Sequence, residues 1–330
     1  MRRLLRAVLL LALLAVAGAG GGWLYLTSWL ERPGPLREPA VVHLPPGTGV
    51  AGIAGILAGA GAVDHPLLFQ LGARLTGRDR ELRAGEYALR PGATPAAIVD
   101  LLSRGEVLLH RIAVPEGLTV REVWALLGAA DVLAGELPPP PPEGALLPET
   151  YLVPRGEARG KVAARMREDM RRELETAWAA RAPDLPLRTP EEALTLASII
   201  EKETRVPAEY GTVASVFVNR LRRGMRLQTD PTVIYAVTGG AGAQALGREL
   251  TAADLAVDHP YNTYKVAGLP PGPIANPGRG ALAAALRPAQ TDYLYFVADG
   301  SGGHAFARTL EEHGRNVARW RRLNKDKPAG

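Results

Sequence analysis

The longest hydrophobic stretch of the chain lies at its N-terminus. An uncharged run over residues 7–30 follows three basic residues, Arg2, Arg3 and Arg6. A helix of this length, rising about 1.5 Å per residue, crosses a hydrocarbon core of roughly 30 Å. The basic flank predicts a cytoplasmic tail over residues 1–6 and a single-pass transmembrane anchor over 7–30. The rest of the chain is then expected outside the cytoplasmic (inner) membrane, in a periplasmic or other extracytoplasmic space.

A cleaved signal peptide is the alternative interpretation of this stretch. The segments 15–17 and 17–19 each read Ala-x-Ala, which resembles a cleavage site. The apolar run continues past both of them, and its aromatic residues Trp23, Tyr25 and Trp29 are typical of a membrane-interface belt. We therefore favour an uncleaved anchor. Both interpretations export the remainder of the chain.

A weak repeat of strand, glycine turn and helix follows a proline-rich linker over residues 31–40. Its predicted helices cover 50–57, 95–102 and 120–127, each after a Gly turn. Thr94 and Thr119 occupy the N-cap positions of the second and third helices, and Gly49 that of the first. Units of this kind build small α+β modules, so we expect one over residues 41–112. Contact of this module with glycan and a spacer role both remain open.

The polar and apolar pattern of residues 189–204 predicts a buried helix that ends in carboxyl groups. Thr189 followed by Pro190 is a strong helix start. Apolar residues recur at i, i+3, i+4 and i+7, and the two adjoining stripes continue into Glu201 and Glu203. A carboxyl on an apolar stripe is expected to have a raised pKa, which suits a general acid. The alternative is an ordinary helix end whose glutamates point to water.

Further helices and polar loops follow this helix. Helices are predicted over 158–181 and 208–223, and a buried strand over 293–298. Polar groups cluster in the loops between them, at Gln228, Thr229, Asp230, Tyr261, Asn262 and Asn276. Tyrosine rings and side-chain amides suit the faces and hydroxyl groups of sugars. Turn chemistry explains much of the same pattern, and helix capping explains Asp230 as well as ligand contact does.

Composition narrows the possible chemistry. The 330 residues are 47% hydrophobic, carry a formal net charge of +5 and include no cysteine. Disulfides, thiolate metal sites and a cysteine nucleophile are therefore excluded. The six histidines show no metal-ligand spacing, so we expect neither a metal nor another cofactor. The diffuse positive charge favours an anionic envelope polymer or phospholipid headgroups over nucleic acid.

Six motifs in order resemble the YceG-like (MltG) family of endolytic murein transglycosylases. They are Glu201-Lys-Glu-Thr, Asn219-Arg-Leu, Gln228-Thr-Asp-Pro-Thr, Tyr261-Asn-Thr-Tyr, Gly268-Leu-Pro-Pro-Gly-Pro-Ile and Tyr295-Phe-Val-Ala-Asp-Gly. The resemblance covers about residues 41–320. It implies an α+β chain with a single transmembrane helix, a LysM-like module over 41–112 and a YceG-like catalytic domain over 113–330. Asp258-His259 departs from the family, which often has serine before the tyrosine motif.

The resemblance also implies an activity and its residues. The family cleaves the β-1,4 bond between N-acetylmuramic acid and N-acetylglucosamine without water, leaving 1,6-anhydro ends. Its acid maps to Glu201, with Glu203 as the competing candidate. Its groove residues map to Asn219, Gln228, Thr229, Asp230, Tyr261, Asn262 and Asn276. Implied partners are nascent peptidoglycan strands, the membrane and peptidoglycan synthases (penicillin-binding proteins). A non-catalytic peptidoglycan-binding scaffold and a conventional muramidase remain the alternatives.

Overall fold

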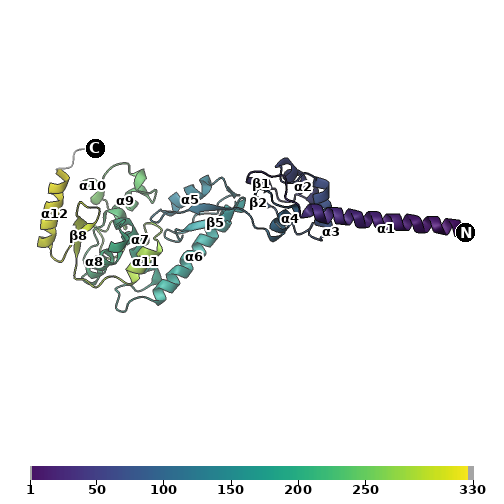
Figure 1. The fold of residues 1–330 in the computed structure, drawn as a ribbon. Helices are drawn as coiled ribbons and strands as arrows, with labels where there is room; N and C mark the ends of the chain where they lie inside the picture. The colour runs from purple at the N-terminus through teal and green to yellow at the C-terminus, as the bar shows by residue number, and fades with distance from the viewer. Residues whose placement is uncertain (1, 326–330) are drawn as a thin grey trace. The chain divides into compact units, whose positions relative to one another are not determined.

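The computed structural model describes residues 2–325 and confirms a mixed α+β protein with an N-terminal apolar helix (Figure 1). The chain forms two compact units. The first comprises Met1–His110 with Leu152–Gly156, and the second comprises Arg111–Tyr151 with Glu157–Gly330. The division falls within two paired strands, β3 (Leu109–Ala113) and β5 (Thr150–Pro154).

The apolar N-terminal segment is the helix α1 (Arg2–Leu30). It is the one helix in the described residues that is long and apolar enough to cross a membrane. Its last turn has a different role, because Leu26, Trp29 and Leu30 are buried in the core of the first unit. The indole Nε1 of Trp29 donates a hydrogen bond to Asp64 Oδ1 at 3.1 Å. The assignment of Trp29 to a membrane-interface belt is therefore wrong, since this ring packs inside the protein.

The remainder of the first unit is a small α+β module. Its elements are β1 (Ala40–Leu44), α2 (Val50–Gly59), α3 (Pro66–Leu75), β2 (Gly85–Leu89) and α4 (Pro95–Arg104). The strands β1 and β2 pair antiparallel, with Val42 opposite Tyr87, and both side chains are buried. Thr94 caps α4 as predicted, since its hydroxyl accepts a bond from Ala97 N at 3.1 Å. The segment before β1 is bonded to the module, through Gly34 N to Ala93 O and Gly92 N to Leu36 O.

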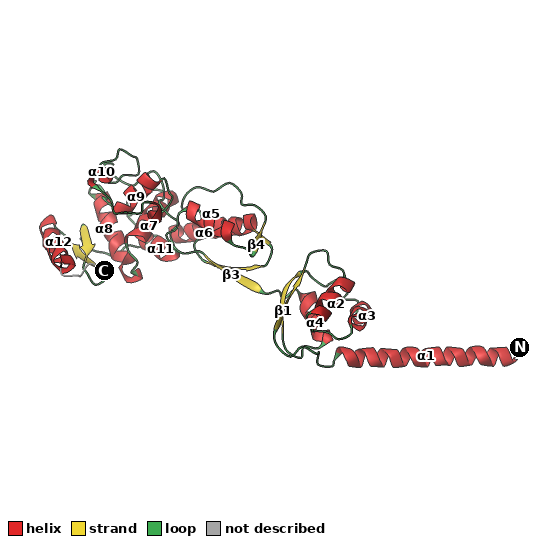
Figure 2. Ribbon diagram, turned by 90° about the horizontal axis from the view of Figure 1, so that it is seen from above, coloured by secondary structure: helices red, strands yellow, loops and turns green. Residues whose placement is uncertain are grey.

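Helices dominate the second unit, and its strands form only short pairs (Figure 2). Its helices are α5 (Val120–Ala129), α6 (Arg159–Ala179), α7 (Pro190–Glu203), α8 (Tyr210–Arg222), α9 (Asp230–Thr238), α10 (Ala252–Leu255), α11 (Arg279–Leu286) and α12 (Leu310–Lys325). Two 3-10 turns are η1 (Pro207–Glu209) and η2 (Ala243–Ala245). Its short strands are β4 (Leu133–Ala134), β6 (Glu157–Ala158), β7 (Tyr295–Ala298) and β8 (His304–Ala307).

The core of the second unit lies around α7, α8 and α11. All eight residues of α7 from Ala193 to Ile200 are buried, which confirms the predicted buried helix. The helices predicted over 158–181 and 208–223 are present as α6 and α8. A strand is present within the predicted range 293–298, as β7, but the prediction that it is buried is wrong. β7 and β8 form a two-stranded hairpin, and the side chains of β7 are only partly buried or exposed.

Candidate active site

Glu201 occupies the last turn of α7, where the buried helix reaches a cleft. Thr189 caps the start of α7 by accepting a bond from Glu192 N at 3.2 Å, and Pro190 opens the first turn. Two donors hold the Glu201 carboxyl. Tyr210 Oη donates to Oε1 at 3.0 Å, and Gly278 N donates to Oε2 at 2.9 Å. The ends of α7, α8 and α11 therefore fix this side chain from three directions.

The cleft lies wholly within the second unit and has a volume of about 580 Å3. Glu201 shares it with Glu116, Lys202, Tyr210 and Tyr235, among other residues. A cleft of this size holds a few sugar rings or a small ligand. Lys202 Nζ donates to Gly117 O at 3.0 Å, so the side chain beside Glu201 ties down the loop that forms one wall.

Glu116 is a second carboxyl in this cleft, and the sequence analysis missed it. A Cβ placed on Gly278 would lie 1.6 Å from Glu116 Oε1, so only glycine fits there in this arrangement. Glu201 binds the N–H of the same glycine, and both carboxyls therefore flank Gly278. Burial, and next the charges of Glu201 and Glu149, raise the pKa of Glu116.

The repeat contains the signal that could have identified Glu116. The turns of its three units end in Gly47, Gly92 and Gly117, all with positive φ. The residue before the glycine is proline in the first two turns and Glu116 in the third. An acid that replaces proline in the third of three similar turns is a local departure from the pattern.

Glu203 lies near Glu201 in sequence but does not line the cleft. Its carboxyl accepts a hydrogen bond from the Thr229 hydroxyl at the start of α9. Burial raises the pKa of Glu203 to about 7, and the nearby charge of Asp230 acts in the same direction. Glu203 is therefore a glutamate of α7 with a raised pKa, and it lies outside the cleft.

Glu143 is a further carboxyl that the sequence analysis did not connect with chemistry. It accepts a bond from Val120 N at 2.8 Å, at the start of α5. The hydroxyl of Tyr235, a ring that lines the cleft, donates to it at 3.4 Å. Burial raises the pKa of Glu143 to about 7. This carboxyl therefore supports the cleft wall from behind Tyr235.

Two amides among the predicted groove residues hold backbone segments of the second unit in place. Asn276 is fully buried, and its Nδ2 donates to Leu118 O at 2.8 Å while its Oδ1 accepts from Leu146 N at 3.0 Å. Asn262 is also fully buried and donates to Leu255 O and Val257 O at 3.1 and 2.8 Å. These bonds give both amides a role in shaping loops.

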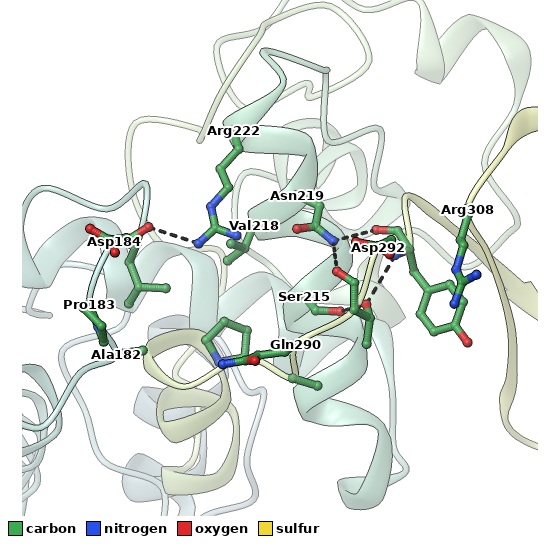
Figure 3. A pocket seen from close by; sticks show the side chains of 15 residues that line it. Ala182, Pro183, Asp184, Ser215, Val218, Asn219, Arg222, Gln290, Asp292 and Arg308 are labelled. Atoms are coloured by element: carbon green, nitrogen blue, oxygen red, sulfur yellow. Dashed lines mark hydrogen bonds between the residues drawn. The ribbon is translucent and has the colours of Figure 1, made fainter.

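Asn219 lines a separate pocket of about 760 Å3, to which α8 also contributes Ser215 and Arg222 (Figure 3). Its Nδ2 donates to Thr291 O at 2.7 Å and to Tyr293 O at 3.0 Å, as the dashed lines show. Ser215 Oγ, one turn earlier on α8, lies 2.7 Å from Thr291 Oγ1. The amide of Asn219 therefore holds the segment that leads into β7.

The remaining predicted groove residues lie around the start of α9. Thr229, and not Asp230, occupies the N-cap position, and the carboxylate of Asp230 accepts a bond from Tyr264 Oη at 2.7 Å. Gln228 is exposed, with a left-handed φ of 51°. The ring of Tyr261 lies 4.9 Å from that of Tyr235, centroid to centroid. Tyr261 thus backs a ring that lines the cleft without lining it itself.

No group of three or more potential metal ligands occurs among the residues that the structure describes.

Comparison with known proteins gives a consistent picture. A profile of the YceG-like family matches residues 42–319. An endolytic murein transglycosylase of Bacillus subtilis is 33% identical, over 89% of this chain and 88% of that protein. An endolytic murein transglycosylase of Streptococcus pneumoniae strain D39 is 29% identical over 93% of this chain, which spans 63% of that relative. A YceG-like protein of Listeria monocytogenes, of solved structure, is 31% identical over 84% of this chain and 99% of its own, with a TM-score of 0.48.

Proposed function

This chain belongs to the YceG-like family, and on that premise we propose that it is a lytic transglycosylase that cleaves the glycan strands of peptidoglycan. The observation that carries the proposal is the position of Glu201. A carboxyl at the end of a buried helix reaches a cleft, and two donors from other helices hold it there. A single positioned acid is what this cleavage requires, because the substrate supplies its own nucleophile.

In the proposed reaction Glu201 acts first as acid and then as base. Its proton passes to the glycosidic oxygen, the bond from that oxygen to C1 of N-acetylmuramic acid breaks, and an oxocarbenium-like centre develops at C1. The ionised carboxylate then takes the proton of the C6 hydroxyl of the same sugar. O6 closes onto C1 and leaves a 1,6-anhydro end, with no water consumed.

The two hydrogen bonds to Glu201 suggest which oxygen exchanges the proton. The backbone N–H of Gly278 can only donate, so Oε2 remains an acceptor throughout the reaction. The hydroxyl of Tyr210 can donate or accept, so it tolerates Oε1 with or without a proton. We therefore assign the proton transfer to Oε1, with Tyr210 as a positioning residue.

Glu116 has an electrostatic role in this proposal. Its carboxyl lies beside Gly278, the residue whose N–H also binds Glu201, so a negative charge on Glu116 lies in the same cleft as the reacting sugar. The same charge stabilises the positive centre that develops at C1. A second carboxyl would also serve a conventional muramidase, so the chemistry of the product ends decides between the two reactions.

The anchor and the module have proposed roles of their own. We assign α1 to a single membrane span with its N-terminus in the cytoplasm, since Arg3 and Arg6 flank the apolar run. The module over 41–112 is taken as LysM-like and the part over 113–330 as catalytic. Glycan contact by the module, work beside peptidoglycan synthases and termination of nascent strands belong to the same proposal.

The test is mass spectrometry of products from nascent peptidoglycan strands digested with the full-length chain in detergent micelles. The full chain is needed because Leu26, Trp29 and Leu30 belong to the core of the module. Anhydro-muramyl ends in internal fragments, absent with Glu201→Gln, are the expected result. Reducing ends would indicate a hydrolase. Binding to the strands without cleavage, by a protein of normal unfolding temperature, would indicate a scaffold.

A further inference from the structure

The outer face of α3 in the first unit carries three exposed leucines. Leu67, Leu71 and Leu75 are 76%, 45% and 51% exposed. Their spacing of four residues puts them in one stripe along the helix. The inner face of α3 is buried through Phe69, Gly72 and Ala73. A helix on a water-exposed surface normally has a polar outer face, so this stripe is an unusual one.

The same helix packs against the end of α1. A Cβ placed on Gly72 would lie 2.7 Å from Leu30 Cδ2, so the last turn of α1 lies directly on the glycine. Trp29 is bonded to Asp64, and its ring lies 6.3 Å from that of His65, which precedes α3. Both views place α3 at the edge of the module on the side toward which α1 extends (Figures 1 and 2). The helix α3, which carries the leucine stripe, therefore lies where the apolar helix emerges from the module.

We propose that α3 is an interfacial helix, with Leu67, Leu71 and Leu75 inserted into the lipid surface around the end of α1. This inference rests on the proposed membrane span of α1. The lipid surface is the occupant that the structure favours, because the stripe lies beside an apolar helix that is part of the same folded unit. A membrane that surrounds α1 ends within reach of α3.

The charges of the module decide which kind of lipid contact is expected. Residues 31–110 contain eight Arg and Lys residues and eight Asp and Glu residues, so their formal charges cancel. Attraction to anionic lipids is therefore weak, and burial of the leucine side chains drives the insertion. Insertion should occur in zwitterionic lipid and should be insensitive to salt. It fixes the module against the membrane, where a free linker would let it move away.

The absence of cysteine makes this inference directly testable. The full-length chain with Leu71→Cys, labelled with an environment-sensitive fluorophore, is reconstituted into phosphatidylcholine vesicles. Val41→Cys is the matched control, since Val41 is an apolar residue of β1 that is 58% exposed. Trp23→Cys, on the exposed part of α1, reports on the membrane span. Lipids with a nitroxide on the acyl chain serve as quenchers.

We expect several-fold stronger quenching at Leu71 than at Val41, and the same result in high salt. Leu67→Gln with Leu75→Gln should reduce that quenching, and because both side chains are exposed the fold should be retained. If the label at position 23 is quenched but the labels at positions 71 and 41 are quenched equally, the interfacial helix is overturned. The membrane anchor is then retained. A label at Leu71 shielded from water yet unquenched would mean that protein covers α3, which also overturns it. No quenching at all three positions would remove the anchor and this inference together.

Discussion

The two units hold their buried carboxyls in opposite ways. In the first unit, the carboxyl of Glu86 lies between two basic side chains, His110 and Arg155. The hydrogen bond from His110 is the largest influence that lowers the pKa of Glu86. In the second unit, Glu143 and Glu203 accept bonds from a backbone N–H and from hydroxyl groups, and burial raises the pKa of each to about 7.

The type of hydrogen-bond donor distinguishes a structural carboxylate, Glu86, from Glu143 and Glu203, which can hold a proton near neutral pH. A cationic partner keeps a buried carboxylate ionised and fixed in one geometry. Neutral donors orient a carboxyl and leave both of its protonation states accessible. Two uncharged donors, a tyrosine hydroxyl and a backbone N–H, also orient the carboxyl of Glu201 in the cleft. The surroundings of a glutamate, and not its helix, therefore indicate whether it can take part in proton transfer.

The largest expected effect is on activity in the second unit. Glu201→Gln should lower the cleavage rate by roughly 10³-fold or more, because the amide cannot give up or accept the proton. The similar shape of the amide should leave the unfolding temperature unchanged. Glu203→Gln is the matched control and should retain activity within about tenfold, since a carboxyl outside the cleft serves only local structure. Initial rates of strand cleavage measure the effect of each variant. If Glu203→Gln lowers the rate more than Glu201→Gln does, Glu203 is the catalytic acid.

Deletion of residues 1–30 should affect the first unit alone. It removes Leu26, Trp29 and Leu30 from the core, at a cost of at least about 4 kcal/mol in the free energy of unfolding. Hydrogen exchange with mass spectrometry should show lost protection in the module and normal protection in α7 and α8. A chain that begins at residue 23, and so keeps the last turns of α1, is the control. Equal protection in both chains would contradict the packing of α1 on the module.

The two units should respond to pH with opposite signs. The pKa of Glu86 is lowered on folding, so its contribution to stability is present above its usual value near 4.5 and is lost as pH falls through the folded value. The pKa of Glu203 is raised to about 7, so its contribution is present below 4.5 and is lost as pH rises toward 7.

The change for Glu203 is at most about 3 kcal/mol between those limits. Calorimetry of the full chain in micelles from about pH 2 to 8 measures this change in the free energy of unfolding, beside Glu203→Gln and Glu86→Gln. Compared with the wild type, the stability of Glu203→Gln should depend less on pH between 5 and 7. The stability of Glu86→Gln should depend less on pH below 5. If the stability of the wild type does not fall both toward low pH and toward pH 7, the contrast between the two units is wrong.

The smallest expected effect concerns Glu116. Glu116→Gln should lower the rate by roughly tenfold, because the negative charge that stabilises the positive centre at C1 leaves the cleft. Glu116→Asp keeps the charge and should recover part of the rate. The unfolding temperature of Glu116→Gln distinguishes this role from a structural one. It should stay unchanged while the rate falls, whereas loss of a structural role would lower it.

Local sequence signals predicted much of the fold. Thr189 and Pro190 mark the start of α7, and Thr119 forms the predicted cap of α5, where its hydroxyl and the Glu122 side chain satisfy each other's backbone N–H groups. Such contacts join residues within one turn, so a short window of sequence contains both partners. The helix α3 escaped prediction because its leucines occupy the outer face as well as the inner one, which obscures the helical period.

The candidate site was predictable only in part. Glu201 could be identified from its motif and its helix, but its cleft partner Glu116 lies in a distant segment of the chain. The amides of Asn219, Asn262 and Asn276 fitted a sugar groove by residue type. Each of them instead bonds to backbone carbonyls that the fold places beside it. A side-chain amide binds whichever donor or acceptor lies nearby, so its residue type does not determine its role.

The sequence by itself determined the apolar N-terminal helix, the strand–turn–helix pattern, the buried helix that ends at Glu201, and the family. These depend on hydrophobic periodicity and on contacts within a turn, which are properties of neighbouring residues. Only the tertiary structure decided that Glu201 and Glu116 flank one glycine, that Glu203 lies outside the cleft, and that the end of α1 belongs to the core of the module. These features depend on burial and charge between segments far apart in the chain, and such distances exist only after folding.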